Sequence, residues 1–397
     1  MELNEKMFAL GAKSSVIREI FEYGKKRKAE IGEDKVFDFS LGNPSVPAPS
    51  VVNETLAALL CERDSVALHG YTSAVGDNNV RAAIAKYIND TYGAGVAAEN
   101  IYMTAGAAAS LTITLGALVN EGDEVIVIAP FFPEYRVFAE KAGATLRVVI
   151  SDMETLQIDI DALAAAINEK TKAVIVNSPN NPTGAVLTED TVRKLAALLD
   201  ERSQAYGHEI FLISDEPYRE LVYGDVKVPY LINEYKNTVV CYSFSKSLSI
   251  PGDRIGYILV SPRINGWKRL FLAVCGAGRS LGYVCAPSMF QHLIPACLGK
   301  TSDIAVYDKN RKLLYGALTE YGFKAIRPDG AFYLFVKSPE SDAYAFCERA
   351  KKYELLLVPS DDFGVGGFVR ISYCVSTEQI ERSLDAFKAL AKEYGLN

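Results

Sequence analysis

Between residues 100 and 262, short runs of apolar residues alternate with longer stretches of helical periodicity. Runs such as VIVIA (125–129), AVIV (173–176) and VVCY (239–242) are apolar at every position. A strand buried on one face alternates apolar and polar residues, so a continuous run indicates a strand covered on both faces. The alternation of such strands with helices therefore predicts an α/β fold with a central, mostly parallel sheet and helices on both faces.

The two ends of the chain lack this regular alternation. Residues 13–31 are typical of one long helix, and the last hundred residues mix strand-like runs with helices. We therefore predict two domains. The large α/β domain is expected at residues 48–285, and residues 1–47 and 286–397 are expected to form a smaller α+β domain together.

The composition argues against several classes of function. The net charge is −7, and no basic run is longer than GKKRKAE (24–30), so a surface for nucleic acid is not expected. No stretch approaches the roughly 20 apolar residues of a membrane span. The seven cysteines form no CxxC pair, which is typical of free thiols in a reducing compartment, and the three histidines are scattered. We predict a cytoplasmic protein that binds no metal, nucleic acid or membrane.

Polar residues and glycine follow the apolar runs. Ligands of open α/β sheets bind at the carboxyl ends of the strands, so these residues are expected to meet in one cleft. They are Gly106, Ala107, Ala108, Phe131, Phe132, the segment NSPNNPTG (177–184), the segment DEPY (215–218) and the segment SFSK (243–246). Such a cleft contains a carboxylate, a phenol, an amide, an amine and an aromatic face.

One group of these residues suits a phosphate next to a reactive amine. TAGAAAS (104–110) places a glycine where a helix begins, and the free N–H groups and dipole of a helix start favour an anion. Ser243, Ser245 and Arg254 are expected to complete the anion site. A desolvated lysine beside an arginine has a lowered pKa and becomes nucleophilic. Lys246 therefore suits a Schiff base with a phosphorylated aldehyde.

Asp215 ends the buried run EIFLIS, where a carboxylate is costly unless it meets a cation. A protonated pyridine nitrogen would be such a cation, and the interaction would make the ring an electron sink. Tyr218 and Asn181 are placed to hydrogen-bond a phenolate oxygen on that ring, and Phe132 to stack on its face. Together these residues predict a site for pyridoxal phosphate.

The motifs NNPTG, SDEPY, SFSKSLSIPGDRIGY and GFVRIS resemble those of the class I/II aminotransferases, which are fold type I pyridoxal-phosphate enzymes. The resemblance covers nearly the whole chain in the family's motif order. It implies that Lys246 is the Schiff-base lysine and general acid/base. It also implies that Asp215 holds the pyridine nitrogen and that Asn181 and Tyr218 contact the ring oxygen. Arg370 matches the arginine whose planar fork binds the substrate α-carboxylate.

Further residues are assigned by the resemblance alone. Gly42, in SLGNP, matches a glycine whose backbone approaches the same carboxylate. Tyr71 matches a tyrosine that reaches the cofactor phosphate of the neighbouring subunit, which implies a homodimer with shared active sites. Ala107 and Ala108 depart from the family, whose members often carry a hydroxyl there, so a side-chain donor is lost while the backbone N–H groups stay. Phe132 stands where relatives often have tyrosine or tryptophan.

The sequence leaves the amino donor open. A dicarboxylate needs a second cation for its side chain. Lys13 matches a side-chain-binding lysine of some bacterial aspartate and prephenate aminotransferases, although a solvated lysine at a helix start explains it equally well. Arg279 is a further candidate. With 22 tyrosines and 18 phenylalanines in the chain, an aromatic donor stays open, as does alanine.

We therefore predict a ping-pong aminotransferase that moves an amino group from aspartate or a similar L-amino acid to a 2-oxo acid, with 2-oxoglutarate as the expected acceptor. A β-eliminating C–S lyase on the same scaffold is an alternative, because it shares the cofactor and the proton transfer at Cα. A non-catalytic cofactor-binding regulator is a second alternative. It is disfavoured because the chain shows no additional nucleic-acid module.

Overall fold

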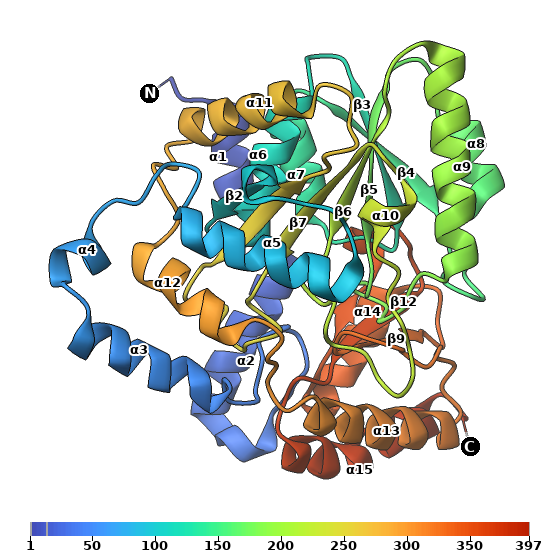
Figure 1. The fold of residues 1–397 in the computed structure, drawn as a ribbon. Coiled ribbons are helices and arrows are strands. Elements are labelled where there is room, and N and C mark those ends of the chain that lie inside the picture. The colour runs from blue at the N-terminus through green and yellow to red at the C-terminus, as the bar shows by residue number, and fades with distance from the viewer. Residues whose placement is uncertain (1, 13–14, 397) are drawn as a thin grey trace.

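The computed structural model describes residues 2–12 and 15–396, and its centre is a seven-stranded sheet (Figure 1). The strand order is β2-β8-β7-β6-β5-β3-β4. Every neighbouring pair is parallel except the two pairs made by β8, which runs antiparallel to β2 and β7. The strands are β2 (Ile101–Thr104), β3 (Glu124–Ala129), β4 (Thr145–Ile150), β5 (Thr171–Asn177), β6 (Phe211–Asp215), β7 (Thr238–Ser243) and β8 (Gly256–Val260). The predicted mostly parallel sheet is confirmed.

Helices cover both faces of this sheet, as predicted. One face carries α6 (Ala107–Leu118), α7 (Glu134–Lys141) and α11 (Trp267–Ser280). The other face carries α5 (Asn78–Tyr92), α8 (Ile160–Ala166), α9 (Glu189–Tyr206), α10 (Leu231–Glu234) and α12 (Ser288–Cys297). Successive side chains of a strand point to opposite faces. Val239 of β7 accordingly packs in the first layer and Val240 in the second, which is why the run is apolar throughout.

The two ends of the chain share a second hydrophobic core. Phe39, near the N-terminus, packs in the same cluster as Phe332 and Phe387. A three-stranded antiparallel sheet of order β11-β12-β9 and a short parallel pair β1-β10 lie in this unit. Its elements are β1 (Phe37–Asp38), β9 (Tyr333–Lys337), β10 (Leu355–Leu356), β11 (Val358–Pro359), β12 (Phe368–Ser372), α13 (Ile304–Glu320), α14 (Ala343–Ala350) and α15 (Thr377–Glu393).

The exact division into two domains stays a prediction. Helix α12 follows the predicted boundary at residue 285, yet it packs on α5 and on α3 (Ser50–Glu62). Leu293 and Ile294 of α12 share a core with Ile84 of α5. In Figure 1 these three helices lie beside the large sheet, and α13 and α15 lie below it.

The long helix expected at residues 13–31 is present as α2 (Val16–Ile31), and a short helix that was not predicted, α1 (Glu5–Ala12), precedes it. Residues 13 and 14 lie outside the described part. Ser15 is the N-cap of α2, because its hydroxyl accepts a hydrogen bond from the backbone N–H of Arg18 at 3.4 Å. α2 carries Ile17 to the cavity described below.

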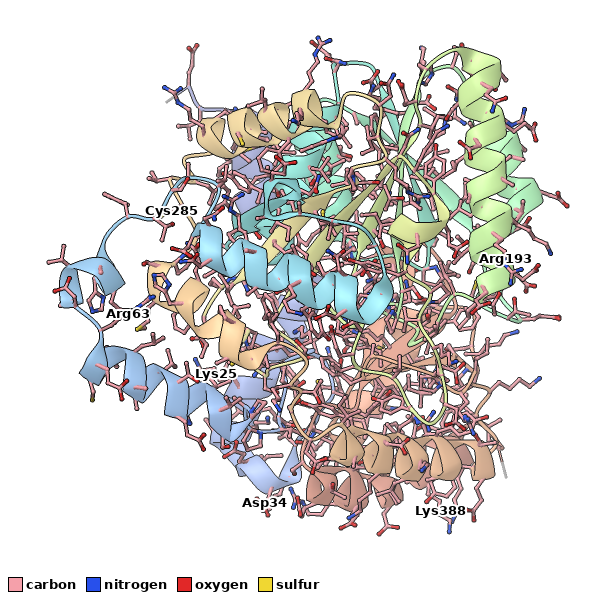
Figure 2. The ribbon with its side chains drawn as sticks, viewed as in Figure 1. Lys25, Asp34, Arg63, Arg193, Cys285 and Lys388 are labelled. Atoms are coloured by element: carbon pink, nitrogen blue, oxygen red, sulfur yellow. The ribbon has the colours of Figure 1, made fainter. Side chains whose placement is uncertain are left out.

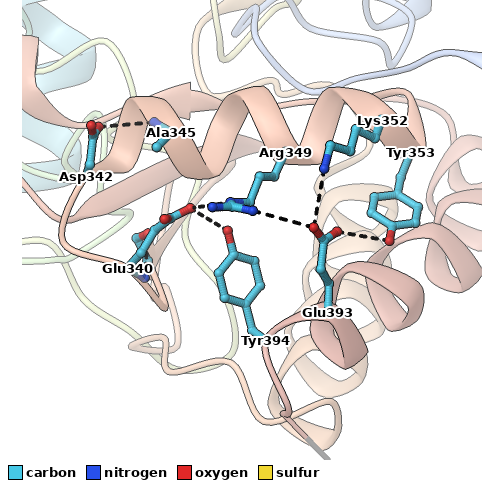
Figure 3. Close-up of polar contacts among 9 residues, drawn as sticks. Glu340, Asp342, Ala345, Arg349, Lys352, Tyr353, Glu393 and Tyr394 are labelled. Atoms are coloured by element: carbon cyan, nitrogen blue, oxygen red, sulfur yellow. Dashed lines mark hydrogen bonds and ion pairs between the residues drawn. The ribbon is translucent and has the colours of Figure 1, made fainter.

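A polar network joins α14 to the end of α15 (Figure 3). Arg349 pairs with Glu340 at 3.2 Å and with Glu393 at 3.7 Å. Tyr394 donates to Glu340, and Tyr353 donates to Glu393 at 3.1 Å. Exposed pairs of this kind contribute at most about 1 kcal/mol each, so the apolar core between these helices supplies most of the stabilisation.

Many charged side chains are exposed to solvent. Lys25, Asp34, Arg63, Arg193 and Lys388, which Figure 2 labels, are examples. In the part of the chain that the structure describes, no helix combines the length and apolarity needed to cross a membrane.

Candidate active site

A cavity of about 290 Å³ lies at the carboxyl ends of β5, β6 and β7. Asn177, Asp215 and Ser243, the last residues of these strands, all line it. Residues from α2, β9 and β12 close the cavity from the side of the second core. Twelve of the predicted site residues line this one cavity, namely Gly42, Ala107, Ala108, Phe132, Asn181, Asp215, Tyr218, Ser243, Ser245, Lys246, Arg254 and Arg370.

Three other predicted residues, Gly106, Tyr71 and Arg279, are not among the described residues that line it. Gly106 is the N-cap of α6 and directly precedes Ala107, which lines the cavity. Tyr71 is 87% exposed in the single protomer, after α4 (Ser65–His69). Arg279 is exposed in the last turn of α11. Lys13 lies outside the described residues.

Lys246 is half-buried at the cavity, in the turn that follows β7. Its Nζ donates a hydrogen bond to the backbone carbonyl of Gly42 at 2.8 Å. Burial, with smaller contributions from the charges of Arg254 and Arg370, lowers the pKa of Lys246 to about 8. At this pKa a substantial fraction of the amine is neutral, and therefore nucleophilic, near neutral pH.

Asp215, at the end of β6, is 4% exposed. Its Oδ2 accepts a hydrogen bond from the hydroxyl of Tyr135 at 2.5 Å, and Oδ1 is buried without a partner in the described part of the chain. Burial raises the pKa of Asp215 to about 7, although the Tyr135 hydroxyl opposes the rise. Arg219, only four residues away, pairs instead with Glu216 at 2.5 Å. The free oxygen of Asp215 is therefore available to a donor or cation from a ligand.

The anion-binding end of the cavity is the start of α6. Gly106 has φ of +90°, and a Cβ placed on it would lie 2.8 Å from the Arg254 guanidinium, so glycine lets the arginine approach the helix start. Arg254 itself has φ of +56°, an uncommon conformation that is often retained at functional sites. The hydroxyls of Ser243 and Ser245 are 2.7 Å apart. Backbone N–H groups, hydroxyls and a guanidinium thus surround one end of the cavity.

Arg370 of β12 is 2% exposed and lies opposite the strand ends. Its guanidinium packs between the rings of Tyr333 and Phe363, whose centroids are 4.8 and 5.2 Å away. It donates to the side-chain oxygen of Asn181 at 3.1 Å and to the carbonyl of Ser40. Its Nε is buried and has no partner within the described residues. The two rings hold the planar fork in one orientation, which suits bidentate binding of a carboxylate.

Sequence reasoning missed two tyrosines at this site. Tyr135 touches Asp215, and Tyr333 lines the cavity between Tyr218 and Arg370. A signal for Tyr135 was available, because a buried carboxylate needs a donor and Tyr135 follows Phe132 by three residues. Nothing in the sequence indicated Tyr333, because it lies within the apolar run AFYLFV, where a tyrosine is expected to be a core residue.

Comparisons with known proteins agree with this geometry. A family model described as "Aminotransferase class I and II" matches residues 34–387. An aspartate aminotransferase of Thermotoga maritima is 32% identical over 377 residues, covering 93% of this chain and 95% of that protein. Among solved structures, an amino transferase from Eubacterium rectale has a TM-score of 0.98 and 55% identity, covering 99% of each chain. An aspartate aminotransferase from Thermus thermophilus with maleate has a TM-score of 0.87 and 26% identity, covering 98% of this chain and 100% of that one.

The fold and the match across the chain define a fold type I transaminase. The chain belongs to the aminotransferase class I and II family, which the motifs predicted, and the family is known to use pyridoxal phosphate. The predicted aminotransferase function is thereby confirmed, whereas the roles of single residues and the choice of amino donor are taken up as proposals below.

Proposed function

We propose that the cavity binds pyridoxal phosphate and that the protein transfers the amino group of L-aspartate, or of a similar dicarboxylic amino acid, to a 2-oxo acid such as 2-oxoglutarate. The observation that carries the cofactor is the buried Oδ1 of Asp215, which has no partner among the described residues and belongs to the same cavity as Lys246. A protonated pyridine nitrogen satisfies the carboxylate, and an aldehyde suits a lysine of lowered pKa.

The other cavity residues fit the remaining parts of this cofactor. The N–H groups of Ala107 and Ala108 at the start of α6 would bind the phosphate together with Arg254 and the two serine hydroxyls. Asn181 and Tyr218 would hold the ring oxygen, and Phe132 would stack on the ring. When bound, pyridoxal phosphate supplies a carbonyl carbon that condenses with amines and a pyridinium ring that withdraws electrons from the substrate Cα.

In this proposal some residues of the chain bind the substrate and others transfer protons. Arg370 binds and orients the α-carboxylate of the substrate. Lys246 would serve as the base that moves the proton at the substrate Cα, and its Nζ is held by a hydrogen bond to the Gly42 carbonyl. Asp215 would hold the pyridine nitrogen in its protonated form. Because the same residues serve donor and acceptor, the two substrates are expected to bind in turn.

Replacing Arg370 by lysine is expected to raise the KM for the amino donor by about 10- to 100-fold, because a point charge replaces a planar fork that makes charge-assisted hydrogen bonds. Steady-state kinetics with saturating 2-oxo acid measure this. The matched control is Arg349→Lys, which makes the same change in the exposed network of Figure 3. A KM equal to that of the wild type in the Arg370 variant would contradict the assignment.

The lowered pKa of Lys246 predicts how cofactor loading depends on pH. Only the neutral amine attacks an aldehyde, so the rate at which the cofactor-free protein reacts with pyridoxal phosphate should rise about tenfold per pH unit below pH 8. Above pH 8 the rate should level off. Stopped-flow absorbance at the visible band of the product follows the reaction. A rate that keeps rising to pH 10 would show that Lys246 has an ordinary pKa.

The dicarboxylic donor is supported by the relatives, which include aspartate aminotransferases and a structure with maleate. Its side chain needs a cation beyond Arg370. We propose Lys13 for this role, since it lies two residues before the N-cap of α2, whose Ile17 lines the cavity. Lys13→Ala should then lower kcat/KM for aspartate and leave kcat/KM for alanine within about threefold, a change of less than 1 kcal/mol.

An aromatic donor is a second candidate, and the cavity wall favours it. Ile17, Leu41 and Leu111 line the cavity, and within the described residues its cations are Lys246, Arg254 and Arg370, all of which have other roles. The visible spectrum during addition of each amino acid, without any 2-oxo acid, separates the candidates. Loss of the band with aspartate and recovery with 2-oxoglutarate supports the dicarboxylic donor. A response to phenylalanine alone supports the aromatic one, and release of pyruvate and ammonia from a cysteine conjugate supports the lyase.

We also propose that the protein works as a homodimer in which Tyr71 reaches the phosphate site of the second copy. Exposed apolar side chains support an interface. They come from α3, from α4 and the residues just after it, from α11 and from the segment after α11, namely Leu60, Val66, Tyr71, Leu272, Leu281, Tyr283 and Val284. In Figure 1 these elements lie on the left, and Figure 2 labels Cys285 at the end of that segment. Size-exclusion chromatography with light scattering measures the molar mass of the protein in solution. A fully active monomer would contradict the proposal.

Two predictions from the sequence are kept as proposals. The first is the large domain of residues 48–285 with a smaller domain from both chain ends. The second is a cytoplasmic location, which is supported by the free state of all seven cysteines. The second proposal is tested by counting free thiols. Cells are quenched with acid, the protein is isolated, and its cysteines are labelled. An oxidising compartment would leave disulfides, which do not react with the label.

A further inference from the structure

Tyr333 connects three parts of the candidate site. It belongs to β9, is 2% exposed, and lines the cavity. Its hydroxyl lies 2.9 Å from the hydroxyl of Tyr218, and its ring lies against the Arg370 guanidinium. The hydroxyl also lies so close to Gly42 that a Cβ there would be 2.0 Å away. A residue of the small sheet thus reaches across the cavity to the loop that follows β6.

The bond between the two phenols has one orientation that agrees with the proposed function. Each phenol has a single hydrogen to donate. Tyr218 is expected to donate its hydrogen to the anionic ring oxygen of the cofactor, because a charged acceptor makes the stronger hydrogen bond. The Tyr218 oxygen then accepts, and the neighbouring Tyr333 hydroxyl, 2.9 Å away, is in place to donate to it.

We propose that Tyr333 is a positioning residue that donates to Tyr218 and thereby directs the single hydrogen of Tyr218 toward the ring oxygen of the cofactor. The inference rests on the proposed function, since it requires pyridoxal phosphate in the cavity. Tyr333 acts through Tyr218. Both phenols are buried, so solvent does not compete strongly for their hydrogens.

The arrangement has a consequence for the imine that Lys246 forms with the cofactor. When the imine nitrogen is protonated, its N–H shares the negative ring oxygen. When the nitrogen is deprotonated, the ring oxygen depends more on Tyr218. A donor to this oxygen therefore stabilises the deprotonated imine more than the protonated one and lowers the imine pKa. Because a donated hydrogen bond strengthens the next bond in the chain, Tyr333 should add to this effect.

The test is a pH titration of the visible absorption band of the loaded protein. Tyr333→Phe is expected to raise the imine pKa by about 0.2 to 0.6, the share that cooperativity adds to a charge-assisted hydrogen bond. Tyr218→Phe is expected to raise it by about 1 to 2, because the whole bond is lost. The phenylalanine at position 333 keeps the ring against Arg370, so the KM for the amino donor should stay within about threefold, less than 1 kcal/mol.

A double variant distinguishes the positioning role from a general loosening of the site. In the Tyr218→Phe background, the additional Tyr333→Phe change should leave the imine pKa where it is, because the only route from Tyr333 to the ring oxygen has gone. The matched control is Tyr373→Phe. Tyr373 is also buried and also pairs with a second tyrosine, Tyr223 at 3.3 Å, but it does not line the cavity.

Each outcome is decisive. An unchanged imine pKa in Tyr333→Phe overturns the inference, and so does a rise of equal size in the Tyr218→Phe background or in the Tyr373→Phe control. The wild-type protein reports separately on the proposed function. If it forms no visible band with pyridoxal phosphate, the cofactor assignment fails. If the wild-type band forms and titrates, only the role of Tyr333 is in question.

Discussion

Replacing Lys246 by alanine is expected to lower the rate of amino-group transfer by at least about four orders of magnitude. Two proposed functions would be lost together, because the same amine would hold the cofactor and move the proton at Cα. The pKa of this lysine is lowered to about 8 by desolvation, and no other amine lines the cavity in the described part of the chain. The cofactor pocket itself should survive, since Asp215, Arg254 and the start of α6 remain.

The measurement pairs turnover with cofactor binding. We expect the Lys246→Ala protein to bind pyridoxal phosphate reversibly, as shown by equilibrium dialysis, without the visible band of a protein imine. Lys388→Ala is the control, because Lys388 is exposed on α15 far along the chain from the strand ends (Figure 2). Turnover within tenfold of the wild type in the Lys246 variant would show that the proton is moved by another group.

The sequence predicted those residues whose burial costs free energy unless a group of opposite charge or a hydrogen-bond partner is present. A lysine and a carboxylate that end apolar strands are conspicuous, because burial penalises both charges. Lys246 and Asp215 were found for this reason, and the structure brings both to one cavity. The sheet was predictable on similar grounds, since apolar runs such as that of β7 need cover on both faces.

One tyrosine that lines the cavity, Tyr333, could not be found in this way. Tyr333 is amphipathic, so its place in an apolar strand is fully explained by core packing. Its hydroxyl contacts Tyr218, 115 residues earlier in the chain, and only the assembled fold shows that the two hydroxyls meet. Arg219 lies only four residues from Asp215 in the sequence, yet in the structure it pairs with Glu216, so closeness along the chain would not have identified the partner of Asp215.

Replacing Asp215 by asparagine is expected to lower kcat/KM by about 10²- to 10⁴-fold, because breaking a buried ion pair costs about 3–5 kcal/mol. Asparagine keeps the shape of the side chain and can still accept from Tyr135, so the loss isolates the charge. Within the described lining of the cavity, Asp215 is the only carboxylate, and no neighbour can replace it. Asp190→Asn, which removes an exposed partner of Lys194, is the matched control.

The same substitution should have the opposite effect on the stability of the cofactor-free protein. Burial raises the pKa of Asp215 to about 7, above its value of roughly 4 in the unfolded chain. Ionising it in the fold is therefore unfavourable, and this penalty grows from pH 4 and is complete above pH 7. Cofactor-free Asp215→Asn should melt at a higher temperature than the cofactor-free wild type above pH 7, and the difference should shrink toward pH 4. A variant that loses activity and is also less stable at every pH would mean that Asp215 serves the fold, because a carboxylate kept for a ligand is a cost until the ligand arrives.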